Sequence, residues 1–240
     1  LAIITTIDFD HMQWLGETRE AIGFEKAGIL RAAQPVVCGD PSPPQSIADV
    51  AVEVGANLYQ IDKEFKYKLN ANSWNFSCRG HTLNDLPLPI LRCQNVATSL
   101  MAASLLNDRL PLDWSIVAEA VARAQLAGRF EDFAFDRCCG VVDVAHNPQS
   151  CEWLAEQLKQ QNPGRKVIAV VGMLEDKNID AALAPLLPII KQWYVGGLQH
   201  VDARGASAAQ VSATLPTNIC HSYEQIEAAI EAAFANVQTD

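Results

Sequence analysis

Side chains that could bind a metal ion follow directly after the first apolar run of the sequence. Residues 1–7 are mostly apolar, and Asp8, Asp10 and His11 come at once behind them. In open α/β sheets, ligands bind beyond the carboxyl ends of the strands. Carboxylate oxygens are the ligands that hard cations such as Mg²⁺ prefer. The pattern therefore predicts a metal and phosphate centre after this strand.

Lys26 stands near the end of a predicted helix, residues 17–28, for which Thr18 is a candidate cap. The helical spacing places Phe24 and Ile29 on an apolar face beside the lysine. We expect this face to desolvate the ammonium partly and to favour a neutral, reactive amine. The alternative is a lysine that only interacts with the helix dipole, which is worth about 0.3–1 kcal/mol.

Two more polar residues stand where predicted elements begin or end. Asn95 opens a strongly helical stretch, where an asparagine can cap the helix or pair with the N6/N7 edge of adenine. Arg129 follows Gly128, which supplies backbone freedom at a predicted hinge between a helix and a strand. Arg129 is an isolated cation in this segment, and one interpretation is a surface arginine without a role.

A second strand end carries an acidic and an imidazole group. The predicted strand, residues 141–145, contains Asp143 near its end and stops at His146. These residues could contact a ligand beyond the sheet. Alternatively, Asp143 makes only a turn at the end of the strand, with Pro148 starting the next helix.

The first of these stretches resembles the signature of folylpolyglutamate synthases and dihydrofolate synthases, members of the Mur-ligase superfamily. That signature has a DH pair after a strand, then LG, then a helix that ends in EKAGI. The matching residues are Asp10, His11, Leu15, Gly16, Glu25, Lys26, Ala27, Gly28 and Ile29.

The resemblance implies a role for each candidate residue. It implies that His11 ligates magnesium and that Lys26 is carbamylated, so that the resulting carboxylate helps to organise the metal site. It further implies that Asn95, Arg129 and Asp143 bind ATP. His146 is expected near the phosphates or the incoming amino acid, and with Lys26 it is our candidate for the catalytic groups.

The predicted order of elements indicates an α/β protein. From Gly140 the chain reads as strand, helix, strand, helix, which is typical of a doubly wound sheet, although no dinucleotide fingerprint GxGxxG follows the first strand. With the resemblance, this predicts the end of a Mur-ligase-type central ATPase domain, residues 1–127. A Rossmann-like C-terminal ligase domain, residues 128–240, follows it.

Composition excludes several other classes of protein. The 18 Lys and Arg against 28 Asp and Glu give a net charge of −10, which opposes binding to nucleic acid. No apolar run approaches the roughly 20 residues of a membrane helix. The seven scattered cysteines show no CxxC pair, as expected of buried thiols in a reducing compartment. We therefore expect a cytoplasmic monomer without nucleic-acid or membrane partners.

The function implied by the resemblance is ATP-dependent ligation in folate biosynthesis. ATP and Mg²⁺ would be the cofactors, and L-glutamate would be added to dihydropteroate or tetrahydrofolate through an acyl phosphate. A cell-wall precursor ligase of the Mur type and a non-catalytic nucleotide-binding fragment are the alternatives. The family's GKGS phosphate loop is expected upstream of Leu1 and its last strand after Asp240. We therefore expect the 240 residues alone to be inactive.

Overall fold

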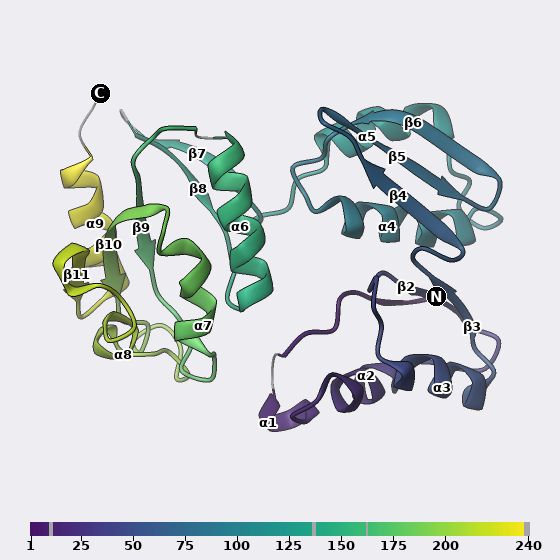
Figure 1. Ribbon diagram of the computed structural model, residues 1–240, viewed down its shortest axis with the longest axis horizontal. Helices are drawn as coiled ribbons and strands as arrows, with labels where there is room; N and C mark the ends of the chain where they lie inside the picture. The colour runs from purple at the N-terminus through teal and green to yellow at the C-terminus, as the bar shows by residue number, and fades with distance from the viewer. Residues whose placement is uncertain (10–11, 136–137, 162, 238–240) are drawn as a thin grey trace. The chain divides into compact units, whose positions relative to one another are not determined.

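The computed structural model describes residues 1–9, 12–135, 138–161 and 163–237. The chain divides into two compact units, residues 1–127 and 128–240 (Figure 1). Each unit contains a parallel sheet of three strands together with antiparallel strands, and helices pack against these sheets. The prediction of an α/β fold is confirmed.

A parallel sheet with the strand order β1–β2–β3 begins the first unit. This layer consists of β1 (Ala2–Ile4), α1 (Met12–Leu15), α2 (Arg19–Ala27), β2 (Pro35–Cys38), α3 (Gln45–Val54) and β3 (Asn57–Gln60). The helices α2 and α3 pack together, and one core includes Ile22 and Ile47 from them and Val36 and Cys38 from β2. Val37 belongs to a different core, so β2 is buried on both faces, as is usual in parallel sheets.

An ionised side chain from α2 caps the start of α3. Pro44 is the residue before α3 and makes no side-chain cap. Instead, the Glu20 carboxylate accepts hydrogen bonds from the backbone N–H groups of Ser46 (2.9 Å) and Gln45 (3.1 Å). These bonds lower the pKa of Glu20, because they stabilise its charged form. They also satisfy amides that the first turn of a helix leaves without partners.

The second layer of this unit is an antiparallel sheet with the order β4–β5–β6. It contains β4 (Phe65–Leu69), β5 (Ser73–Cys78), β6 (His81–Pro87), α4 (Cys93–Leu105), a 3-10 turn (Trp114–Ile116) and α5 (Val117–Arg123). Trp74, Phe76 and Cys78 alternate along β5 and are buried, whereas the residues between them are partly exposed. The sheet therefore has one packed face, and Met101 of α4 lies in the same core.

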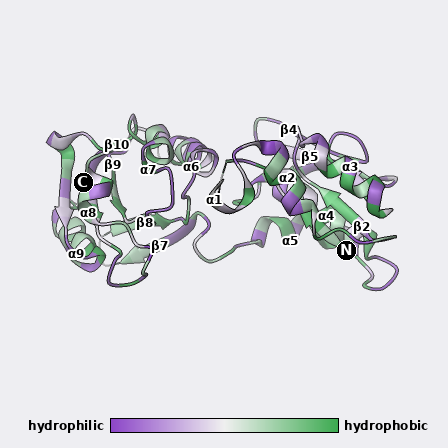
Figure 2. Ribbon diagram, turned by 90° about the horizontal axis from the view of Figure 1, so that it is seen from below, coloured by the Kyte–Doolittle hydropathy of each residue, from purple (hydrophilic) through white to green (hydrophobic). Residues whose placement is uncertain are grey.

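The second unit contains a parallel sheet with the order β11–β10–β9, which has helices on both faces. Its elements are β7 (Glu131–Phe135), β8 (Cys138–Val142), α6 (Pro148–Gln161), β9 (Val167–Val171), α7 (Ile179–Leu183), β10 (Ile190–Gly196), α8 (Ala208–Ser212), β11 (Cys220–Tyr223) and α9 (Ile226–Asn236), with 3-10 turns at Ala184–Leu186 and Thr217–Ile219. All five residues of β9 are apolar, as its colour in Figure 2 indicates. On β10, Trp193 faces one core, and Tyr194 packs with Ala229 and Ala233 of α9 in another. This is the doubly wound arrangement that the sequence predicts.

The strand β6, which ends at Pro87, lies at the edge of its sheet, where a missing N–H is tolerated. Two elements differ from the sequence prediction. The strand β7 was not predicted, and it forms an antiparallel hairpin with β8. The strand β8 ends at Val142, so Asp143 lies after it and not within it.

Gly39 allows β2 and α4 to approach each other closely. An added Cβ would lie 2.2 Å from Oγ1 of Thr98, a side chain that is buried and donates a hydrogen bond to the Gln94 carbonyl. We expect Gly39→Ala to lower the free energy of unfolding by about 1–3 kcal/mol, measured by urea denaturation. Adding Thr98→Ala should restore part of this loss, because it removes the clashing hydroxyl. Unchanged stability of Gly39→Ala would contradict this packing.

In the part of the chain that the structure describes, no helix is both long and apolar enough to cross a membrane. The longest helix there is α6, whose residues include Glu152, Glu156 and Lys159.

Candidate active-site residues

The loop after β1 is held at its start by a buried carboxylate. Oδ2 of Asp40, a residue that is 1% exposed, accepts hydrogen bonds from the Ile7 N–H (2.8 Å) and from Nη2 of Arg19 (3.0 Å). Oδ1 accepts the N–H of Ser42 (2.8 Å), and Nε of Arg19 donates to the Ile7 carbonyl (2.9 Å). Asp40 and Arg19 thus fix the chain immediately before Asp8. Sequence analysis passed over both, although Asp40 follows an apolar strand.

The predicted metal ligand His11 and its neighbour Asp10 lie outside the described residues. Within the described ranges, no group of three His, Cys, Asp or Glu side chains is arranged to hold a metal ion. Asp8 is described, and its Oδ1 accepts the N–H of Phe9 (2.8 Å). The described residues therefore do not form a complete metal site, and the assignment of His11 stays a prediction.

Lys26 lies in the last turn of α2, and Thr18 caps that helix through a bond from the Ala21 N–H (3.1 Å), as predicted. The expected desolvation is wrong, because Phe24 is 56% exposed, Ile29 is 50% exposed and Lys26 is also exposed. The helix turns by about 100° per residue, so Phe24 points away from the buried Ile22. Carbamylation of Lys26 stays a prediction from the family resemblance alone, without support from desolvation.

Asn95 is not the cap of its helix. The helix α4 begins two residues earlier, with Arg92 at the cap position, so Asn95 lies inside the first turn with its side chain exposed. This removes the capping alternative, and ATP binding by Asn95 stays a prediction. The neighbouring Gln94, which sequence analysis missed, donates from Nε2 to Oγ1 of Thr6 (2.8 Å) and to the Gly39 carbonyl (2.6 Å). Gln94 thereby ties α4 to the ends of β1 and β2.

Asp143 and the segment around Arg129 come together in the second unit. Oδ2 of Asp143 accepts the N–H of Phe130 (2.8 Å), and Oδ1 accepts the N–H of Ala145 (2.7 Å). The second bond closes a turn after β8, which is the alternative role that sequence analysis gave for Asp143. The first bond links Asp143 to Phe130, the residue after Arg129. The side chain of Arg129 itself is exposed.

The turn after Asp143 carries His146. Its Nδ1 lies 2.9 Å from the Val144 carbonyl, and because a carbonyl only accepts, Nδ1 is the donor. Oδ1 of Asn147 accepts the N–H of Ser150 (2.9 Å), and α6 begins at Pro148, as the alternative interpretation of this segment has it. These contacts set the direction of His146 at the start of α6.

The loop after β9 contains a nearly buried cation that sequence analysis missed. The Lys177 side chain is 6% exposed, and its Nζ lies 3.7 Å from Oδ2 of Asp176. A buried lysine beyond the carboxyl end of a parallel strand is a candidate for binding an anionic ligand. The available signal was the charged run from Glu175 to Lys177 after a fully apolar strand.

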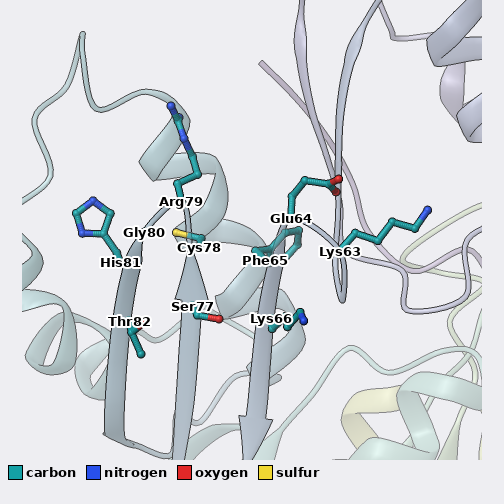
Figure 3. Close-up of a pocket in the computed structure, with 10 residues that line it drawn as sticks. All are labelled: Lys63, Glu64, Phe65, Lys66, Ser77, Cys78, Arg79, Gly80, His81 and Thr82. Carbon is teal, nitrogen blue, oxygen red and sulfur yellow. The ribbon is translucent and has the colours of Figure 1, made fainter.

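A shallow, open hollow lies at the end of the antiparallel sheet in the first unit. Figure 3 shows its lining, which includes the basic side chains Lys63, Lys66, Arg79 and His81 together with Phe65 and Cys78. Arg79 has a positive φ and forms a turn with Gly80 between β5 and β6. None of the candidate residues from the sequence lines this hollow, so we do not include it in the candidate site.

Comparison with known proteins covers the whole chain. Residues 128–240 match the family described as Mur ligase, glutamate ligase domain. Over all 240 residues the chain is 38% identical to the dihydrofolate synthase/folylpolyglutamate synthase of Escherichia coli (strain K12) and covers 55% of it. The chain thus spans about half the length of such relatives.

Two solved structures are similar over nearly the same range. One is E. coli FolC in complex with DHPP and ADP, with a TM-score of 0.87 and 38% identity over 99% of this chain and 56% of that chain. The other is a bifunctional folylpolyglutamate synthase/dihydrofolate synthase with Mn, AMPPNP and L-glutamate bound. Its TM-score is 0.84 and its identity 39%, over 99% of this chain and 56% of that chain.

Proposed function

Because the chain belongs to the dihydrofolate synthase/folylpolyglutamate synthase family of Mur ligases, we propose that the whole protein is an ATP-dependent ligase in folate biosynthesis. It adds L-glutamate to dihydropteroate, to tetrahydrofolate, or to both. The observation that carries the proposal is similarity along the entire chain to a dihydrofolate synthase/folylpolyglutamate synthase. The nucleotides and L-glutamate in the similar structures support the same substrates here.

In the proposed reaction, a substrate carboxylate attacks the γ-phosphorus of ATP and ADP leaves. The amine of L-glutamate then attacks the carbonyl carbon of the acyl phosphate, and inorganic phosphate leaves. A bound divalent cation would offset the negative charge on the phosphates. We propose that His11 and carbamylated Lys26 hold this cation.

The remaining residues receive binding roles in this proposal. Arg129 binds phosphate and Asn95 the adenine edge, and Asp143 belongs to the same nucleotide site. His146 and the nearly buried Lys177 both follow strand ends of the second unit, where they are suited to the carboxylates of L-glutamate. Residues 1–127 would be the later part of the ATP-binding domain, and residues 128–240 the ligase domain.

We further propose a cytoplasmic monomer. The cysteines of the described residues are free, which suits a reducing compartment. Light scattering on the full-length protein should give the mass of a single chain.

Activity assays on the full-length protein test the function. We expect release of ADP that requires both L-glutamate and dihydropteroate or tetrahydrofolate. Turnover of UDP-linked cell-wall precursors in place of these substrates would identify a Mur ligase of the cell-wall type. ATP binding without ligation of any of them would identify a non-catalytic nucleotide-binding protein.

The carbamate on Lys26 gives a distinct mutational prediction. Lys26→Arg keeps the positive charge but cannot form the carbamate, so it should lower kcat as far as Lys26→Ala does, by at least roughly 100-fold. Short carboxylic acids should partly restore the alanine variant, because they replace the lost oxygen ligand. Lys66→Arg, at an exposed lysine on β4, is the matched control and should leave kcat unchanged. Full activity in Lys26→Arg would exclude the carbamate.

A further inference from the structure

We infer that Asp143 is a positioning residue for Arg129, an inference that rests on the proposed binding of ATP. We define residues 128–131 as the hinge loop. The Asp143 carboxylate fixes the backbone of this loop and therefore the point from which the Arg129 side chain projects. Oδ2 of Asp143 accepts the N–H of Phe130 (2.8 Å), the residue directly after Arg129. Oδ1 is bonded to the N–H of Ala145 (2.7 Å), so the carboxylate itself is held by the turn that follows β8.

The hinge loop has a backbone conformation that needs such support. The φ angles of Gly128 and Phe130 are +66° and +46°, and positive φ is unfavourable for a bulky residue such as Phe130. On either side of Arg129, these two residues turn the chain sharply. A conformation of this kind persists only where the surrounding contacts over-determine it.

Three contacts besides the carboxylate hold the hinge loop, and close packing leaves no room for a side chain at Gly128. The N–H of Val144 donates to the Gly128 carbonyl (2.9 Å), and the N–H of Gly128 donates to Oε2 of Glu131 (2.7 Å). Phe130 is 2% exposed, and its ring packs at 78° to the Trp153 ring, with the ring centroids 5.9 Å apart. An added Cβ on Gly128 would lie 2.9 Å from Cγ1 of Val144. The loop is therefore preformed in this unit.

The direction of the Arg129 side chain is set by its backbone alone, whereas its neighbours are held by side-chain contacts. Among the described residues, its exposed side chain has no hydrogen bond or ion pair that would set its direction. If the Phe130 N–H loses its acceptor, the strained loop can relax and carry Arg129 with it. Asparagine at position 143 has one carbonyl oxygen and a donor NH₂ group, so it cannot accept both N–H groups in the same geometry.

A direct contact and a positioning role make different predictions for a double-mutant cycle. If Asp143 acts through Arg129, the double variant should bind ATP about as weakly as Arg129→Ala alone. If Asp143 contacts the nucleotide independently, the fold-losses in ATP affinity of the two single variants should multiply in the double variant. Equilibrium binding of ATP to the full-length protein would be measured for the wild type, Arg129→Ala, Asp143→Asn and the double variant. Asp132→Asn, an exposed aspartate on β7, is the matched control.

We expect Arg129→Ala and Asp143→Asn each to weaken ATP binding by about 10-fold or more, as loss of a charge-assisted bond would. The double variant should bind no more than about twofold more weakly than Arg129→Ala, and Asp132→Asn should bind as the wild type does. Gly128→Ala displaces the hinge loop while keeping the Asp143 carboxylate, and it should also weaken ATP binding. It serves as the test variant if Asp143→Asn fails to fold. Multiplied effects in the double variant would overturn the inference.

Amide hydrogen exchange without nucleotide supplies a second readout. The Phe130 amide should be protected in the wild type, in Arg129→Ala and in Asp132→Asn, and it should exchange faster in Asp143→Asn. Equal exchange in the wild type and Asp143→Asn would overturn the inference whether or not ATP binds. A wild-type protein that binds no ATP would instead contradict the proposed function.

Discussion

Replacing Arg129 by alanine in the full-length protein should raise the Michaelis constant for ATP by about 10- to 100-fold. This follows because a hydrogen bond to a charged group contributes about 1.5–3 kcal/mol. The constant for L-glutamate should change by less than about threefold, since Arg129 is proposed to contact only phosphate. Initial rates measured with each substrate varied in turn give both constants.

Arg123 provides the matched control for this substitution. It is an exposed arginine on α5, and its Nη2 lies 2.9 Å from Oε1 of Glu119 in a surface ion pair. Such pairs contribute little to stability. Arg123→Ala should therefore leave both Michaelis constants unchanged. An unchanged constant for ATP in Arg129→Ala would remove Arg129 from the site.

Replacing Asp40 by alanine should lower the free energy of unfolding by about 3–5 kcal/mol, because it leaves a charged partner and two amides without their acceptor. The Arg19 guanidinium and the N–H groups of Ile7 and Ser42 all bond to this one buried carboxylate. Urea denaturation followed by a probe in the first unit would measure the loss. We also expect weaker binding of divalent metal in the full-length protein, because the start of the loop after β1 would no longer be fixed.

Asp49 is the matched control for Asp40. It is an exposed aspartate on α3 that accepts a bond from Nε2 of Gln45 (2.9 Å). Asp49→Ala should change the free energy of unfolding by less than about 0.5 kcal/mol. If Asp40→Ala is equally mild, the Asp40 and Arg19 network does not hold the loop.

Local patterns were sufficient to predict most of the elements of this fold. The spacing of apolar residues and the Thr18 cap predicted α2, and Gly55, with a φ of +71°, ends α3 as its sequence indicates. The fully apolar β9 has the composition that is typical of a strand in a parallel sheet, and it pairs in parallel with β10. In each case the signal lies within the element itself.

The wrong predictions concern contacts that depend on the rest of the fold. Asn95 is a good capping residue, but α4 begins two residues earlier, so local propensity did not set the boundary. Phe24 and Ile29 have apolar side chains, yet the sheet covers a different face of α2. No pattern indicated that the Asp40 carboxylate would bind Arg19, which is 21 residues away.

The candidate site was predicted more fully in residue identity than in geometry. The motif around Asp143 identified the residue, but its bond to the Phe130 N–H, 13 residues away, emerges only from the structure. Lys177 was missed because the charged run that contains it has the composition of an exposed loop, and only the structure shows that its side chain is nearly buried. Residue types therefore suggested the chemistry, and the contacts showed how those residues are held.

The fate of labelled oxygen tests the acyl phosphate most directly. The full-length protein would be given ATP, L-glutamate and dihydropteroate whose reacting carboxylate carries ¹⁸O in both oxygens. Attack of this carboxylate on the γ-phosphorus, followed by attack of the amine on carbon, must leave one labelled oxygen in the phosphate that departs. We therefore predict one ¹⁸O atom in inorganic phosphate for each amide formed, measured by mass spectrometry, and amide formation with unlabelled phosphate would contradict the account.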